Sequence, residues 1–205
     1  MELEQIQNEV KKRLSEKRYY HSVCVMERCE ELAIKFGFDI DTAKKVGISH
    51  DIAKELTEEE KLKYCEENGI EVDETEKKNI SLLHAKIGAD MVKKIFGFSS
   101  EMSHAIKAHT TGLPQMDKLA KILFIADRTS KERGFPDIEY LNELLEKNID
   151  QAVLYILDKK IELQLKKQAN IHINTIITRN ELLEGEILWN SYTLQTCTST
   201  LHLHF

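Results

Sequence analysis

Six side chains of metal-binding type lie on or beside the apolar faces of segments with helical spacing. They are four histidines and two aspartates: His21, His50, Asp51, His84, His109 and Asp127. His50, for example, follows Val46 and Gly47 by four and three residues, so it shares a helix face with apolar positions. A buried carboxylate is costly unless it is paired or bound to a metal. Ionisable side chains that project from five helices toward one interior therefore indicate a metal centre.

The types of these ligands narrow the chemistry. Imidazole nitrogens with carboxylate oxygens suit divalent iron, manganese or zinc, and the absence of thiolates argues against a structural zinc site. His50 and Asp51 are neighbours, so they can approach one metal from two sides, or Asp51 can bridge two metals. Six ligands are enough for two metals about 3.5–4 Å apart, which generate a hydroxide nucleophile and offset phosphoryl charge. One inward histidine alone is more often a core residue, so the prediction rests on the combination.

The elements that must position these residues are helices. Apolar spacing, capping residues and glycines predict helices over 2–16, 20–36, 41–54, 58–67, 80–96, 100–109, 115–130, 136–147, 150–168 and 174–184. Thr57 followed by Glu60 is a capping-box signal for the fourth of them. Only 170–178 hints at the alternation of a strand. We therefore expect an all-α fold with a single domain over 1–185, and a C-terminal tail of unclear structure over 186–205.

Composition limits the class of protein. The net charge is −6, and no Lys/Arg cluster stands alone, which argues against a nucleic-acid or anionic-membrane surface. No apolar run approaches the roughly 20 residues that span a bilayer, and the first residues lack the apolar region of an export signal. The four cysteines, Cys24, Cys29, Cys65 and Cys197, form no CxxC pair, as expected of reduced thiols. We expect a cytoplasmic protein; a homodimer is left open.

The order of the six ligands resembles that of the HD-domain superfamily of metal-dependent phosphohydrolases, and more narrowly the YqeK-type family. The resemblance covers about residues 5–185, and its matching segments are RYYHSVCVM (18–26), GISHDIAKEL (47–56), LLHAKIGADMV (82–92), AIKAHTTGLPQMDKLAKILFIADRT (105–129) and RGFPD (133–137). It implies an HD fold with two divalent metals, iron in that family, and symmetrical cleavage of diadenosine tetraphosphate into two ADP by a metal-bridging hydroxide.

The resemblance also implies which residues hold each metal. His21, His50, Asp51 and Asp127 would hold one, and Asp51 would bridge to a second held by His84 and His109. In the family, the aspartate at the position of Asp127 is usually followed by a stretch like YIEPNR, whereas this chain reads RTSKER over 128–133. The expected metal ligands are untouched by this departure, which concerns the nucleotide contacts.

Further residues are candidates for substrate contacts. Lys54 follows Asp51 by three residues, so its ammonium is expected one turn beyond the ligands, in catalytic contact with a phosphate. Arg133 matches a family arginine, and its guanidinium fork suits polyphosphate oxygens. Thr110, Thr111 and Gly112, directly after His109, are expected to line the site. His104 is expected to be exposed, and we assign no role to His172, His202 or His204.

Three functions remain open at this point. The first is the symmetrical hydrolase, whose substrate is a small nucleotide. The second is an HD-domain phosphatase of mononucleotides, because HD ligands alone do not select a substrate. The third is a nucleotide-sensing module with a degenerate site, against which the complete set of six ligands weighs.

Overall fold

The computed structural model describes residues 1–185, which are helical and contain no strand. The elements are α1 (Leu3–Lys11), α2 (Glu16–Phe36), α3 (Ile40–Ser49), α4 (Glu58–Glu67), α5 (Glu74–Lys78), the 3₁₀ helix η1 (Ile80–Leu82), α6 (Leu83–Phe96), α7 (Ser100–Ala108), α8 (Lys118–Thr129), α9 (Ile138–Lys147) and α10 (Ile149–Lys166). A further helical stretch covers 173–185. The expected all-α class is confirmed.

Capping chemistry places several helix ends where the sequence indicated. The side chain of Thr57 accepts the N–H of Glu60 and the Glu60 carboxylate accepts that of Thr57, so α4 begins as predicted. Gly37 and Gly97 end α2 and α6 in the left-handed conformation. Ser15 caps α2, which therefore begins at Glu16 and not at residue 20, whereas α1 stops at Lys11.

Two further expectations were wrong. The helix expected over 41–54 ends at Ser49, and the chain then follows a series of turns, with the Ile52 N–H on the Ser49 carbonyl and the Lys54 N–H on the Asp51 carbonyl. The short helix α5 lies between 67 and 80, where no helix was expected, and the first residues of the helix expected over 80–96 form the 3₁₀ helix η1. The capping box of Asp73 and Glu76 is the signal that would have predicted α5.

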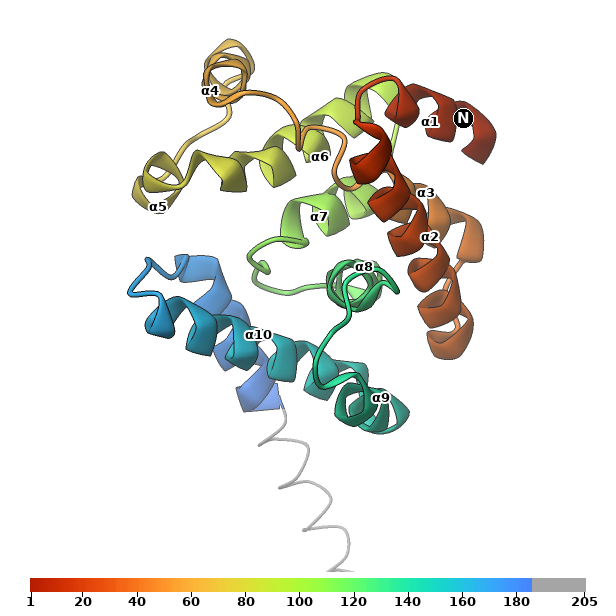
Figure 1. Ribbon diagram of the computed structural model, residues 1–205, viewed down its shortest axis with the longest axis vertical. Helices are drawn as coiled ribbons and strands as arrows, with labels where there is room; N and C mark the ends of the chain where they lie inside the picture. Colours follow the sequence, from red (N-terminus) through yellow and green to blue (C-terminus); the bar gives the residue numbers. More distant parts are fainter. Residues whose placement is uncertain (186–205) are drawn as a thin grey trace, which may run out of the picture.

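Helix α8 lies at the centre of the fold, with α2, α7 and α10 packed against it (Figure 1). Helix α6 packs on α7, so α6, α7, α8 and α10 follow one another across the molecule. Helices α2 and α3 pack closely because residue 47 is glycine: a Cβ there would lie 2.8 Å from the Met26 Cα. The predicted ligands thus lie on or directly after helices that pack on α8 or on α7.

His172, which precedes the helix over 173–185, contacts the start of α5. His172 is buried, and its Nε2 lies 2.9 Å from Asp73 Oδ2, whereas no role was expected for this histidine. The helix over 173–185 contradicts the strand-like reading of 170–178. Cys24, Cys29 and Cys65 are buried free thiols, as expected. No helix within 1–185 is long and apolar enough to cross a membrane. Cys197, His202, His204 and the tail over 186–205 lie outside the described residues.

Candidate metal centre

The structure brings all six predicted ligands together in the interior. His21 comes from α2, His50 and Asp51 from the turns after α3, His84 from the first turn of α6, His109 from the end of α7 and Asp127 from the last turn of α8. All six are buried, with side chains at most 8% exposed. The four imidazoles form a row in which successive ring centroids are 5.3, 5.1 and 5.1 Å apart, in the order His21, His50, His109, His84.

Three of the four imidazoles have their protonation fixed by the backbone. His50 Nδ1 lies 2.8 Å from the Gly47 carbonyl, His109 Nδ1 lies 2.6 Å from the Ile106 carbonyl, and His84 Nδ1 contacts the Ser81 carbonyl. A carbonyl oxygen can only accept, so Nδ1 carries the proton in each ring. In the neutral rings the Nε2 lone pairs therefore face the interior, which is the arrangement of metal-binding histidines.

His21 is held differently, by a side-chain carboxylate. Its Nδ1 lies 2.5 Å from Glu132 Oε1, and this carboxylate oxygen also accepts from the Ser130 hydroxyl at 2.7 Å. A carboxylate on the far nitrogen of a metal-binding imidazole fixes the ring and raises its basicity as a ligand. Glu132 therefore belongs to the site, although the sequence interpretation placed it in the segment that departs from the family.

The two aspartates lie between the imidazoles. Asp51 Oδ1 is 3.2 Å from His84 Nε2 and 3.5 Å from His109 Nε2, whereas its Oδ2 is 3.5 Å from His50 Nε2. Asp127 Oδ1 is 3.2 Å from His21 Nε2 and 3.6 Å from His50 Nε2. Asp51 thus faces both halves of the row, while Asp127 faces the His21 half.

Burial and neighbouring charges determine the protonation of these groups. Burial opposes the charged form of both aspartates, but the charge of His50 beside Asp51 and of Arg128 beside Asp127 holds each pKa well below its usual value. Burial lowers the pKa of His109 to about 4, which leaves this imidazole neutral at pH 7. Burial also acts against charged His50, yet Asp51 and Asp127 raise its pKa to about 10. The two carboxylates are therefore ionised at pH 7, and a cation bound between them would be stabilised by their charge.

The donor set fits a divalent metal. Two groups drawn from the six predicted ligands each offer ligand atoms within 4.8 Å of one another: His21, His50 and Asp127, and His50, Asp51 and His109. His50 Nε2 and Asp51 Oδ1 are buried without a hydrogen-bond partner. His84 Nε2 and His109 Nε2 are 3.1 Å apart, close to the spacing of two nitrogens that each bind one metal at about 2.1 Å. A cation bound among these groups would give the buried His50 Nε2 and Asp51 Oδ1 a partner.

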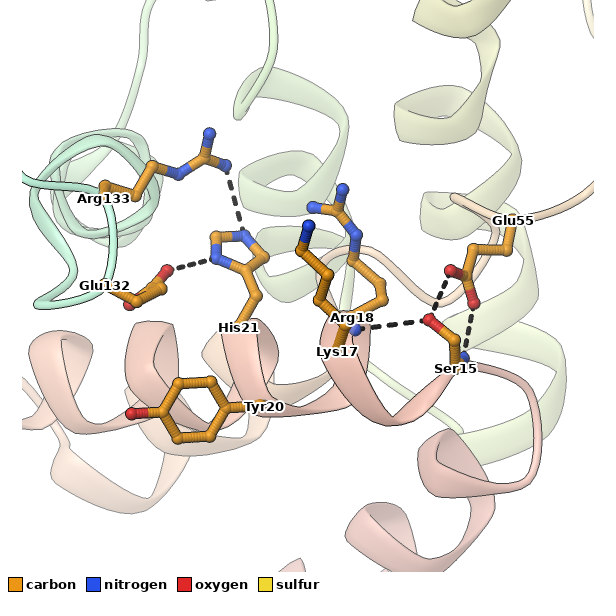
Figure 2. Close-up of a pocket in the computed structure, with 8 residues that line it drawn as sticks. All are labelled: Ser15, Lys17, Arg18, Tyr20, His21, Glu55, Glu132 and Arg133. Atoms are coloured by element: carbon orange, nitrogen blue, oxygen red, sulfur yellow. Dashed lines mark hydrogen bonds and ion pairs between the residues drawn. The ribbon is translucent and has the colours of Figure 1, made fainter.

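A wide cleft of about 590 Å³ opens at the His21 end of the row. Figure 2 shows Lys17 and Arg18 on the same side of α2 as His21. Arg133 extends toward His21 from another segment, and its Nη2 lies 3.2 Å from His21 Nε2. Arg18 Nη1 lies 3.1 Å from Asp51 Oδ2, and Arg133 Nη2 lies 2.7 Å from Asp127 Oδ1. The two acidic residues of the cleft are already engaged, because Glu55 accepts from Ser15 at 2.5 and 2.6 Å and Glu132 contacts His21. The cleft thus carries Lys17, Arg18 and Arg133 beside two carboxylates, and the two arginines also pair with Asp51 and Asp127.

The residues predicted to contact substrate fall in two places. Arg133 lines the cleft, whereas Lys54 lies at the other end of the row, with its Nζ 3.2 Å from His84 Nε2. Thr111 and Gly112 pack against the helix over 173–185: the Thr175 hydroxyl donates to the Thr111 carbonyl at 2.8 Å, and a Cβ on Gly112 would lie 2.9 Å from Thr178 Oγ1. Thr110 offers its carbonyl to Arg128 at 3.2 Å. Substrate contact by all five residues stays a prediction.

Sequence reasoning missed several polar residues near the centre. Arg18 precedes His21 by three residues and so shares its helix face, a signal that could have identified it. Arg128, which contacts Asp127 Oδ2 at 2.9 Å, and Lys160 had no comparable signal. His104 was expected to be exposed, but its side chain is only 33% exposed and lies 3.4 Å from Asp117.

Comparison with known proteins agrees with this geometry. Residues 18–132, which carry all six ligands, match the HD domain, and the chain therefore belongs to the HD domain family. A symmetrical bis(5'-nucleosyl)-tetraphosphatase of Bacillus subtilis (strain 168) is 33% identical over 177 residues, which cover 86% of this chain and 95% of that protein. A protein of the same name from Halalkalibacterium halodurans is 35% identical over 175 residues, covering 85% and 93%.

A solved structure supports the fold along most of the chain. It is a protein of Clostridium acetobutylicum described as a predicted HD superfamily hydrolase involved in NAD metabolism. The two structures agree with a TM-score of 0.85 at 33% sequence identity, over 90% of this chain and 98% of the other. The HD helical fold expected from the sequence is thus confirmed.

Proposed function

We propose that this chain is a metal-dependent hydrolase that cleaves diadenosine tetraphosphate symmetrically into two ADP. The observation that carries the proposal is the match over nearly the whole length of relatives named for this activity, at 33% and 35% identity. The site supplies a chemical reason for it, because buried imidazole and carboxylate ligands adjoin a cationic cleft. A polyphosphate needs both features.

The six ligands divide into two sets. His21, His50, Asp51 and Asp127 would hold one metal, and His84 and His109 would hold a second, with Asp51 shared between them; its position facing both halves of the imidazole row supports this division. Bound divalent metals supply a hydroxide at neutral pH and offset charge on the phosphoryl group. Iron is the metal we propose, while manganese and zinc also fit imidazole and carboxylate ligands.

Residues of the chain would bind and orient the polyphosphate on both sides of the broken bond. Symmetrical hydrolysis joins the oxygen of water to one of the two central phosphorus atoms and breaks that atom's bond to the central bridging oxygen, which leaves with the second ADP. Arg18 and Arg133 are placed to bind phosphate oxygens in the cleft, where a guanidinium can donate two hydrogen bonds. The ammonium of Lys54, beside His84, is placed to contact the phosphate chain at the other end.

Product analysis tests the proposal. The wild-type protein, loaded anaerobically with Fe(II) or with Mn(II), is offered diadenosine tetraphosphate and, in parallel, 5'-mononucleotides. We expect ADP from the first and no orthophosphate from the second. Orthophosphate from mononucleotides without cleavage of the dinucleotide would instead indicate the phosphatase, and nucleotide binding without turnover of either would indicate a sensing module.

A further inference from the structure

The row of imidazoles has a second end, and it is built differently from the first. Beside the segments that carry His84 and His109 lies a narrow cavity of about 40 Å³, bounded by Leu82, Thr111 and Lys160 among others. Leu82 precedes His84 by two residues and Thr111 follows His109 by two, so the segments that carry these ligands also bound the cavity. A space of this size holds about three water-sized groups, which is close to the size of one phosphate group.

Lys160 on α10 brings a cation to this end without a carboxylate to pair with it. Its Nζ donates to the Thr110 carbonyl, the same oxygen that accepts from Arg128 Nη2 at 3.2 Å. Within residues 1–185 Lys160 has no carboxylate within ion-pair distance. By contrast, its neighbour Lys159 lies 3.5 Å from Asp137. Two cations thus share one carbonyl oxygen.

Such an arrangement is unfavourable until an anion arrives. A half-buried ammonium loses hydration, and like charges nearby disfavour its protonated form. Burial, with Arg128 and Lys54, lowers the pKa of Lys160 to about 7, although Asp127 acts in the opposite direction. A phosphate group in the cavity would provide the opposite charge that the surrounding side chains do not.

We propose that Lys160 is a phosphate-binding residue for the nucleotide half that lies at the His84–His109 end of the metal centre. The inference rests on the proposed function, in which the cleft at the His21 end takes the other half. A symmetrical dinucleoside polyphosphate carries the same phosphates on both sides of its centre. It therefore needs cations at both ends of the row: Arg18 and Arg133 lie at one end, and at the other Lys160 would act beside Lys54.

The competing role for Lys160 is structural, as an anchor between α10 and the segment after His109. That segment has a second anchor, because the Thr175 hydroxyl donates to the Thr111 carbonyl. Lys160→Gln separates the two roles: the amide can still donate to the Thr110 carbonyl but carries no charge. Lys160→Arg restores the charge, and Lys159→Gln is the matched control one residue away on the same helix.

The experiment measures ADP binding to the metal-loaded protein by calorimetry, together with KM and kcat for diadenosine tetraphosphate. We expect two ADP per chain for the wild type, Lys160→Arg and Lys159→Gln, and one for Lys160→Gln. The KM of Lys160→Gln should rise about tenfold or more, with kcat changed far less, as expected for loss of a charged hydrogen bond. If the glutamine variant does not fold, Lys160→Met is compared in the same way.

The inference is overturned if Lys160→Gln binds two ADP as tightly as the wild type with an unchanged KM. It is equally overturned if the wild type binds only one ADP, or if Lys160→Gln and Lys160→Arg are equally impaired and melt at a lower temperature, since that pattern indicates an anchor. A different outcome would contradict the proposed function: the wild-type protein would not cleave diadenosine tetraphosphate. The ADP titration then still decides whether Lys160 binds phosphate.

Discussion

The two ends of the imidazole row differ in the cavity beside them, in their cations and in the groups that hold the imidazoles. At the His21 end a cleft of about 590 Å³ carries Arg18 and Arg133, and the imidazole itself is held by the carboxylate of Glu132. At the His84–His109 end the cavity measures about 40 Å³, the cations are Lys54 and Lys160, and the imidazoles are held by backbone carbonyls. The substrate we propose is symmetrical, yet the site that receives it is not.

From this difference we expect the two ends to bind phosphate groups in different ways. Guanidinium groups at the open end can bind phosphate oxygens with two hydrogen bonds each, whereas an ammonium is a compact point charge that suits a narrow space. The backbone anchors of the His84–His109 end cannot be lost by exchange of a side chain. The open end depends on side chains that substitution can change one at a time.

The largest effect is expected at the residue common to both ends. Asp51→Asn should release metal from both halves and lower kcat about a thousandfold or more, because the shared carboxylate charge is lost while the shape is kept. Metal content by mass spectrometry and the initial rate measure it. Asp41→Asn, at an exposed aspartate paired with Lys45, is the control and should behave like the wild type. Full activity of the Asp51 variant without bound metal would refute the metal mechanism.

Separate substitutions at the two ends should remove different metals. His84→Ala or His109→Ala should lower the metal content from two toward one, and His21→Ala should do the same by removing the other metal. Anaerobic metal analysis of the purified variants measures this. A variant at the His84–His109 end that still holds two metals would contradict the division of ligands.

Loss of a cation at the open end should affect substrate binding more than metal binding. Arg133→Met should raise KM for diadenosine tetraphosphate about tenfold or more and leave the metal content unchanged, because a charged hydrogen bond to phosphate is lost. Steady-state kinetics measure this, and Lys131→Met, at an exposed lysine that contacts Glu27, is the control. An unchanged KM would remove Arg133 from the substrate site.

A further substitution concerns the carboxylate that contacts His21 Nδ1. Glu132→Gln keeps an acceptor for the His21 N–H but removes its charge, so metal affinity should fall about 10- to 100-fold. Competition with a chelator of known affinity measures it, beside Glu27→Gln as the control. Equal affinities of the Glu132 variant and the wild type would show that Glu132 only packs against the ring.

The sequence predicted the ligands better than their surroundings. Each ligand lies at helical spacing from apolar residues, and such a pattern can be recognised within a short stretch of sequence. The turns after Ser49 were not predicted, because the apolar pattern continues through Ile52 and Ala53 while the α-helix does not. Lys160 lies in a charged stretch that is typical of a solvent-facing helix, and only the packing of α10 against α8 brings it near Thr110. Contacts between helices distant in sequence have no local signal.

The most direct test of the central claim counts the metals that activity requires. Chelator-treated wild-type protein is titrated anaerobically with Fe(II), and the rate of ADP formation from diadenosine tetraphosphate is followed at each addition. If two metals share Asp51 as a ligand, the rate should rise until two equivalents of Fe(II) per chain have been added and then stay constant. Full activity at one equivalent, with no further increase, would contradict the two-metal centre.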